Sequence, residues 1–292
     1  MTFPQVLVFQ GGGALAMAYL HSLRLLETEA ARNASTISAL CKEFRGVSAG
    51  AMAAVFVSLG LSTYKIEQLC RRLFDLVCGD VIFDLETFLT QRGGKSVMII
   101  NDIINNAIVD VHGKEFADTT FKELHDKTGI TLRIYAAELN CKDPGTRELS
   151  HEQTPEMPVC LAVAASCAIP FVFTPVTFRG MSLVDGNAGI DMTLHKLSEH
   201  KTLVLSVFAN VESKAARLTF QNYIESVVNL LISTMRKTRK RPDCDNENVC
   251  IIDIYSDLGT RAIVGGSESV DAIIDAGTGV ELSQKLLSFL DK

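Results

Sequence analysis

The chain has 292 residues, of which 47% are hydrophobic and 21% charged, and its formal net charge is −6. The apolar fraction excludes an intrinsically disordered chain. The acidic balance argues against general affinity for nucleic acid, which requires a basic surface. No run of about 18 apolar residues, the length of a bilayer span, occurs in the sequence, and the first residues lack a signal-peptide pattern. We therefore expect a globular, cytoplasmic protein.

The eight cysteines form no CxxC pair, and no histidine stands at zinc-finger spacing from a pair. Without a secretory signal this pattern indicates free, buried thiols. Cys244 and Cys250 flank a polar loop, which leaves a metal site or an oxidised pair open there. We expect activity that needs no metal and no other cofactor.

Apolar runs and helical periodicity alternate along the chain, which predicts a parallel sheet with helices on both faces. We expect strands at 6–9, up to Val47, at 130–137, up to Asp185, at 202–208 and at 249–255. We expect helices at 14–31, 49–59, 62–77, 95–109, 119–126, 159–167, 222–236 and 280–290. One domain over 1–292 is predicted: a motif-bearing core at about 5–210, and 211–292 completing the fold. The irregular 78–118 region is expected to form an insertion or cap.

A GxSxG motif, Gly46-Val47-Ser48-Ala49-Gly50, lies between a predicted strand and a predicted helix. A serine on such a sharp turn projects its hydroxyl, and the helix N-terminus stabilises negative charge beside it. The flanking glycines permit a strained backbone and close approach to neighbouring segments. Ser48 is therefore a candidate nucleophile, and a purely structural turn serine is the alternative.

Three consecutive glycines, Gly11, Gly12 and Gly13, follow the first predicted strand. Their backbone N–H groups can face a developing oxyanion or a bound phosphate. Gly11-x-Gly13-x-x-Ala16 also satisfies a loose dinucleotide fingerprint, but the acidic residue that this fingerprint requires is missing after the second strand. The oxyanion interpretation is favoured, with a nucleotide loop or a plain tight turn as alternatives.

Asp185-Gly186 ends another apolar segment, 181–184. In a parallel sheet, a carboxylate after a strand lies at the same edge as Ser48. An Asp-Gly pair carries little weight by itself, but together with the other motifs it predicts a Ser48–Asp185 site.

Together these motifs resemble the patatin-like phospholipase family. Further segments at 120–124, 135–140 and 162–170 are similar to the family as well, and coverage extends over about 5–210 with a weaker echo at 251–259. The resemblance implies a three-layer α/β/α patatin-like fold with a mainly parallel central sheet.

The resemblance also implies an activity, phospholipase A or lysophospholipase, carried by a Ser48–Asp185 dyad without histidine. Ser48 would attack the acyl ester, Asp185 would accept its proton, and water would clear the acyl-Ser48 intermediate. The N–H groups of Gly11, Gly12 and Gly13, with that of Ala49, would form the oxyanion hole, and Gly46, Gly50 and Gly186 would support the motifs. Because an ordinary Asp is a weak base, we expect an apolar setting that raises the pKa of Asp185.

The sequence departs from the family pattern at two places. Where the family often has a basic residue and a glycine, the chain has Leu15-Ala16, and the stretch after Gly186 differs too. These departures leave open a neutral-lipid (acylglycerol) lipase and a catalytically silent scaffold. By chain order alone, His195 or His200 could complete an ordinary Ser–His–Asp triad.

A basic run closes the predicted 222–236 helix and comprises Arg236, Lys237, Arg239, Lys240 and Arg241. Cations at a helix C-terminus are usually solvated and complement the helix dipole. Attraction to anionic lipid headgroups and a nuclear-import signal are the alternatives. Peripheral contact with a lipid surface is therefore one expected partnership, beside a lipid ester substrate.

Overall fold

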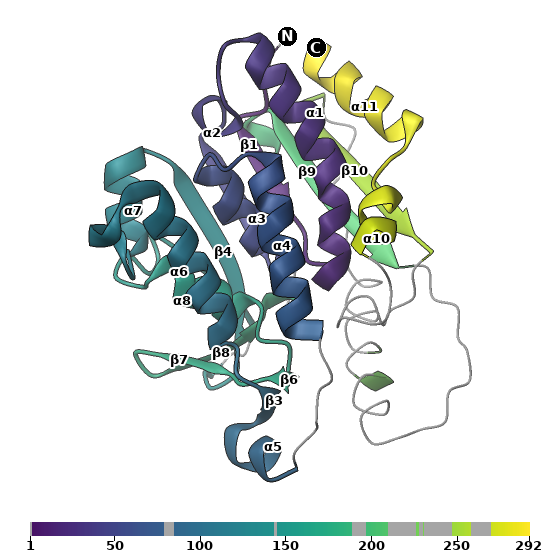
Figure 1. Cartoon of the computed structure of the whole chain (residues 1–292). Coiled ribbons are helices and arrows are strands. Elements are labelled where there is room, and N and C mark those ends of the chain that lie inside the picture. The colour runs from purple at the N-terminus through teal and green to yellow at the C-terminus, as the bar shows by residue number, and fades with distance from the viewer. Residues whose placement is uncertain are drawn as a thin grey trace.

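A computed structural model describes residues 2–78, 85–142, 145–188, 197–209, 226–227, 230, 247–257 and 270–292. Within these residues, an eight-stranded mixed sheet has the strand order β10-β9-β1-β2-β4-β8-β7, with β5 paired to β4 (Figure 1). Its parallel strands are β1 (Val6–Phe9), β2 (Glu43–Val47), β4 (Thr131–Glu138), β9 (Thr202–Ala209) and β10 (Val249–Ser256). Its antiparallel strands are β5 (Gly145–Ser150), β7 (Val176–Phe178) and β8 (Met181–Asp185).

Helices flank this sheet and follow most of the predicted positions. They are α1 (Tyr19–Arg32), α2 (Ile37–Leu40), α3 (Ala49–Ser58), α4 (Thr63–Cys78), α5 (Leu85–Gln91), α6 (Met98–His112), α7 (Phe121–Thr128), α8 (Val159–Ser166), α10 (Val270–Ala276) and α11 (Val280–Asp291). Short 3-10 helices lie at Gly13–Ala18, Lys114–Phe116, Gly186–Ala188 and Leu197–Glu199. A separate two-stranded sheet pairs β3 (Gly93–Lys95) with β6 (Phe171–Phe173).

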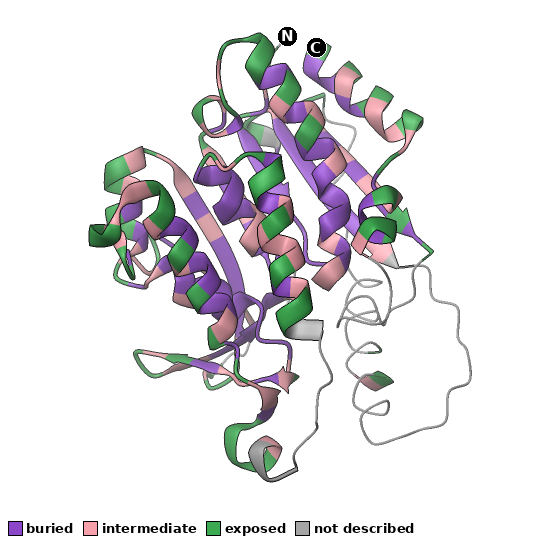
Figure 2. Ribbon diagram, viewed as in Figure 1, coloured by how far each residue is buried: buried purple, intermediate pink, exposed green. Residues whose placement is uncertain are grey.

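The central strands are buried on both faces, as strands of a helix-covered parallel sheet must be. All residues of β1 are buried (Figure 2). Because side chains alternate between faces, Leu7 and Phe9 join the main core under the helices, whereas Val6 and Val8 pack with Leu197 in a second cluster. The side chains of β1 therefore contact the main core on one face of the sheet and the second cluster on the other face.

The structure corrects two sequence expectations about helices. The predicted helix 14–31 begins as a 3-10 helix over Gly13–Ala18, and α-helix starts only at Tyr19. The predicted insertion at 78–118 is wrong for α6, because Ile100, Ile104 and Ile108 are buried in the main core.

The basic run at 236–241 lies outside the described residues, as do the side chains of most of the predicted 222–236 helix. Among the helices described, none combines the length and apolar character that a membrane span needs.

Candidate active site

Ser48 forms the turn between β2 and α3. The strand ends at Val47 and the helix begins at Ala49, which is the strand–serine–helix context that GxSxG predicts. Ser48 has φ 54° and ψ −133°, a conformation that costs a residue with a β-carbon about 1–3 kcal/mol. The surrounding contacts must hold the serine in this strained turn.

The two flanking glycines allow α3 to lie directly against the sheet. A Cβ on Gly50 would stand 2.2 Å from the carbonyl oxygen of Phe9, and one on Gly46 would stand 2.4 Å from the carbonyl oxygen of Gly50. Both obstacles are backbone atoms, which cannot rotate away as a side chain can. Any larger residue would separate the nucleophile helix from the strands that support it.

Asp185 accepts a hydrogen bond from the Ser48 hydroxyl. The distance from Ser48 Oγ to Asp185 Oδ2 is 2.6 Å, and both side chains are buried, with exposed fractions of 4% and 3%. The other carboxylate oxygen, Oδ1, accepts the backbone N–H of Asn187 at 2.8 Å. The carboxylate is thus fixed with one oxygen aimed at the serine.

The reason that these residues meet differs from the one that the sequence suggested. Asp185 does not follow a parallel strand, because β8 runs antiparallel to β4, with Asp185 opposite Ala136. Since β5 occupies one edge of β4 over Arg133–Glu138, β8 must use the other edge, where β2 pairs only as far as Tyr135. Strands β2 and β8 therefore approach each other end to end, and their carboxyl ends bring Ser48 and Asp185 together.

Gly186 lies where these two strand ends converge. A Cβ there would stand 2.3 Å from the carbonyl oxygen of Tyr135 and 2.7 Å from a methyl group of Val47. The Asp-Gly pair thus has a steric reason: the residue after Asp185 has no room for a side chain.

Ser166 supports the nucleophile turn, a role that was not predicted from the sequence. Its hydroxyl accepts the backbone N–H of Ser48 at 2.8 Å and donates to the carbonyl of Tyr135 at 2.6 Å. The side chain is fully buried at the end of α8. A hydroxyl at the end of an otherwise apolar helix was the available signal, because buried polar groups require partners.

The glycine-rich loop lies beside the serine. A Cβ on Gly11 would stand 3.0 Å from the Cβ of Ser48, whereas Gly12 faces Val207. Gly13 and Ala49 line the same cavity as Ser48. In the part of the chain that the structure describes, the N–H groups of Gly12, Gly13 and Ala49 have no protein acceptor. Donors near the serine are therefore open to a ligand.

Ser48 lines an apolar cavity of about 110 Å³. Its wall comes from the glycine-rich loop, α1, α3, α4, α6 and the segment around β6, through Met17, Leu20, Leu23, Met52, Ile66, Leu73, Phe74, Ile100, Ile169 and Phe173 among others. Cys70 and Cys167 also line it. Burial, and then the negative charge of Asp185, raises the pKa of the Cys167 thiol, so this thiol stays neutral beside the serine.

The structure bears on two alternatives from the sequence, a catalytic histidine and a nucleotide-binding loop. Asp185 contacts Ser48 directly, so the dyad geometry leaves no place between them for a histidine. His200 is exposed after the last 3-10 helix, and His195 lies outside the described residues. The loop at Gly13 leads into a 3-10 helix rather than the α-helix N-terminus that a dinucleotide fingerprint needs.

Comparison with known proteins now identifies the family. The sequence model of the patatin-like phospholipases matches residues 7–192. Because this is more than half of the chain, the protein belongs to the patatin-like phospholipase family, a family of lipid hydrolases. The family prediction and the predicted α/β/α fold with a mainly parallel sheet are confirmed.

Two viral proteins are similar to this chain at low sequence identity. An uncharacterized protein of Acanthamoeba polyphaga mimivirus is 26% identical over 246 residues, covering 80% of this chain and 76% of that protein. A "Probable lipid hydrolase" of Invertebrate iridescent virus 6 is 26% identical over 147 residues, covering 49% of this chain and 48% of that protein. The second match thus spans about half of either chain.

Two bacterial structures share the fold. VipD of Legionella pneumophila aligns with a TM-score of 0.54 at 16% identity, covering 99% of this chain and 67% of VipD. ExoU of Pseudomonas aeruginosa, in complex with SpcU, aligns with a TM-score of 0.51 at 16% identity, covering 99% of this chain and 53% of ExoU. At this identity the likeness concerns the fold alone.

Proposed function

We propose that the protein is a serine acyl hydrolase that cleaves fatty acyl esters of phospholipids or lysophospholipids, with Ser48 as nucleophile and Asp185 as base. The observation that carries this proposal is the 2.6 Å hydrogen bond between Ser48 Oγ and Asp185 Oδ2, with Ser48 in the wall of an apolar cavity. Membership of a phospholipase family supports the substrate class.

The reaction proceeds in two halves. Asp185 accepts the hydroxyl proton while Ser48 Oγ bonds to the ester carbonyl carbon, which places negative charge on the carbonyl oxygen. The N–H groups of Gly12, Gly13 and Ala49, which have no protein acceptor within the described residues, stabilise this oxyanion. The intermediate then expels the leaving alcohol, which takes the proton from Asp185. Water, deprotonated by the same carboxylate, releases the fatty acid from acyl-Ser48.

The cavity accepts the acyl chain rather than a polar headgroup. Its wall is almost wholly apolar, and each methylene moved there from water is worth about 0.8 kcal/mol. The position at Leu15, where a basic residue is common in the family, is fully buried, and Ala16 lines the cavity. The glycine-rich loop therefore offers no cation to a phosphate.

This last observation favours a second candidate, hydrolysis of acylglycerols by the same dyad. Fatty acid release from lysophosphatidylcholine and from monoacylglycerol, compared at equal chain length, separates the two. Faster release from monoacylglycerol would select the neutral-lipid candidate.

A fluorophosphonate probe tests the dyad itself. We expect the wild type to be labelled, Ser48→Ala to be unlabelled, and Asp185→Asn to be labelled at least about 100-fold more slowly, since a base contributes roughly 10²–10⁴-fold. Ser58→Ala is the matched control, because Ser58 is buried on the same helix but its hydroxyl donates to the carbonyl of Val55 rather than to a residue of the site. A folded wild type that resists the probe, with or without vesicles, would refute the proposal.

The pH dependence tests the role of the carboxylate. We expect labelling to fall on the acid side as Asp185 becomes protonated, and the acid limb should disappear in the residual activity of Asp185→Asn. A profile whose acid limb is the same in both proteins would assign that limb to another group and remove Asp185 as the base.

A further inference from the structure

Several large apolar side chains remain exposed near the cavity. The exposed fractions are 69% for Leu89, 48% for Leu76, 43% for Met98 and 41% for Phe171. We call these residues the rim. Single exposed apolar residues need no explanation, but neighbouring ones indicate an interaction surface.

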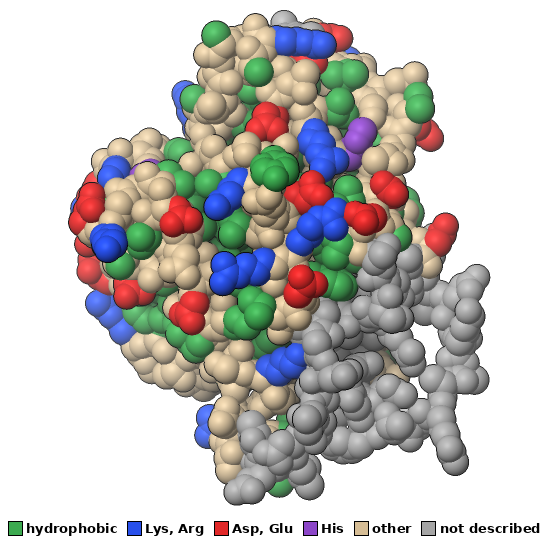
Figure 3. Space-filling model, in the orientation of Figure 1, with side chains coloured by type: hydrophobic (Ala, Val, Ile, Leu, Met, Phe, Trp, Pro, Cys, Tyr) green, Lys and Arg blue, Asp and Glu red, His purple; other side chains and the backbone are tan. Residues whose placement is uncertain are grey.

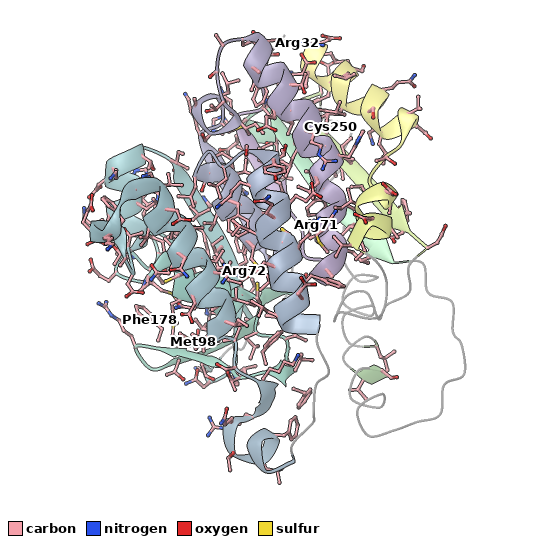
Figure 4. The ribbon with its side chains drawn as sticks, viewed as in Figure 1. Arg32, Arg71, Arg72, Met98, Phe178 and Cys250 are labelled. Carbon is pink, nitrogen blue, oxygen red and sulfur yellow. The ribbon has the colours of Figure 1, made fainter. Side chains whose placement is uncertain are left out.

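The rim belongs to the elements that build the cavity wall. On α4, Leu73 and Phe74 line the cavity and Leu76 is exposed one turn later. On α6, exposed Met98 stands two residues before Ile100, which lines the cavity. Figure 4 shows Met98 at the end of α6 that lies nearest β3 and β6. The apolar wall thus continues outward to the surface.

The small sheet and α5 carry the other rim residues. Strand β3 pairs with β6, with Gly93 opposite Phe171, and Phe171 lies between Ile169 and Phe173, which line the cavity. The ring of Phe88 on α5 lies 6.2 Å from the ring of Phe171. This contact places exposed Leu89, the next residue of α5, beside the same edge.

Phe171 occupies a turn position that favours glycine. The N–H of Val172 donates to the carbonyl of Ile169 at 3.1 Å, with Pro170 at the second turn position and Phe171, at φ 70°, at the third. A left-handed third position is typical of glycine or asparagine. A bulky aromatic residue held there, and still exposed, is a conflict of the kind that concentrates at functional sites.

Exposed cations border the rim. Arg72 on α4, Arg92 after α5 and Arg179 in the β7–β8 turn are exposed, and within the described residues none of them forms an ion pair. Asp75 is an exposed acid on the same part of α4. Figure 3 shows cationic and acidic side chains interspersed with hydrophobic ones over the middle of this face, and Figure 4 labels Arg72 there. Apolar side chains with neighbouring arginines that form no ion pair within the described residues match an anionic bilayer, which has an apolar interior and charged headgroups.

We propose that the rim is a membrane-contact surface. Its apolar side chains enter the interfacial region of an anionic bilayer while the three arginines bind headgroups. The inference rests on the proposed function, because a lipid lifted from the bilayer at this edge meets the wall that leads to Ser48. The rim and its three arginines are other residues than the basic run at 236–241.

Vesicle sedimentation tests this surface. The probe is phosphatidylcholine vesicles with and without phosphatidylserine, and the variants are Leu89→Ser/Phe171→Asn and Arg72→Gln/Arg92→Gln/Arg179→Gln. Asparagine tolerates the positive φ of Phe171, so the first variant should stay folded. We expect each variant to bind anionic vesicles at least about tenfold more weakly than the wild type, since each large apolar side chain moved from water into the bilayer and each cation near an anionic surface contributes severalfold. The arginine variant should also lose most of the salt dependence of binding.

The matched control is Tyr64→Ser/Val280→Ser, which removes two apolar side chains with exposed fractions of 70% and 76% away from the rim. It should bind vesicles as the wild type does. Wild-type vesicle binding by the rim and arginine variants would overturn the proposal and point to a protein partner or no partner at this edge.

Fluorophosphonate labelling in solution separates this inference from the proposed function. Rim variants should be labelled at the wild-type rate without vesicles but should hydrolyse vesicle phospholipid more slowly. If the wild type binds vesicles through the rim but is never labelled, the membrane-contact surface is retained and the proposed hydrolase function is refuted. A rim variant that loses labelling in solution would show that its defect lies in the fold or the site, and would count against a membrane role.

Discussion

Replacing Ser166 by alanine removes the hydroxyl that joins the nucleophile turn to β4. The Ser48 N–H would lose its acceptor and the Tyr135 carbonyl would lose a donor. A buried group left without a partner costs about 1–3 kcal/mol, and the second bond adds about 1 kcal/mol. We therefore expect the free energy of unfolding to fall by about 2–4 kcal/mol, which lowers the melting temperature by roughly 3–7 °C in a chain of this size.

The same change should slow the chemistry, because the strained Ser48 turn loses one of its constraints. A displacement of about 1 Å at a reacting group can cost 10²-fold in rate. Labelling by a fluorophosphonate, measured well below the melting temperature, should show a reduced limiting rate with little change in the probe concentration that gives half of it. Loss of folded protein alone would instead lower the labelled fraction at an unchanged rate.

Ser58→Ala is again the matched control. Ser58 Oγ donates to the Val55 carbonyl, which also accepts the N–H of Leu59, so its loss leaves that carbonyl with a partner. We expect its stability and labelling rate to stay near wild type. If Ser166→Ala were as stable and as reactive as Ser58→Ala, Ser166 would not hold the turn.

Three further predictions use other sites of the chain. Gly186→Ala places a methyl group 2.3 Å from a backbone oxygen of β4 and should reduce fluorophosphonate labelling at least about 100-fold, whereas Gly145→Ala, with nothing within 4 Å, should label normally. Thr120→Ala breaks the capping box of α7 and should lower stability to urea at pH 7 by about 1 kcal/mol. The N–H of Thr120, and then its hydroxyl, donate hydrogen bonds that lower the pKa of Glu123. Thr120→Ala keeps the N–H bond and loses the hydroxyl bond, whose stabilisation is present above the unfolded-state pKa of Glu123 and lost as pH falls through the folded-state value. The difference in urea stability between the two proteins should therefore shrink below about pH 4. Burial, with the charge of a nearby glutamate, raises the pKa of Cys70 to about 12, so mass spectrometry should find Cys70 unmodified after iodoacetamide treatment of native protein at pH 8, and modified after unfolding.

Much of the fold could be predicted because its signals are local. The run Val6–Phe9 is a strand with the predicted bounds, and α3 follows Ser48 directly, because short apolar runs and small-residue helices have distinct patterns. The 3-10 start at Gly13–Ala18 was not predictable in this way, since the same residues suit an α-helix. Its geometry depends on packing, including the close contact of Gly277 with the carbonyl of Ala18.

The candidate site likewise contains residues that could be predicted from the sequence and one that could not. Ser48 and Asp185 could be proposed from motifs, because each motif describes a chain segment that is short in sequence. Ser166 could not be assigned a role, because its partners, the Ser48 N–H and the Tyr135 carbonyl, are far from it in the chain. A pattern within one segment carries no information about such a contact.

The direction of β8 is the most instructive case. The apolar segment that ends in Asp185 indicates a strand but not its direction, and the expectation that this one strand runs parallel to its neighbours was wrong. The pairing of Ser48 with Asp185 survives this error because β2 stops at Tyr135 along β4 and β8 fills the edge beyond it. Two strands that end against each other must both turn away there, which needs a tight turn after each end. Ser48 with its positive φ and Gly186 without a side chain supply those turns, so the reactive pair lies where the sheet forces two chain segments to leave it.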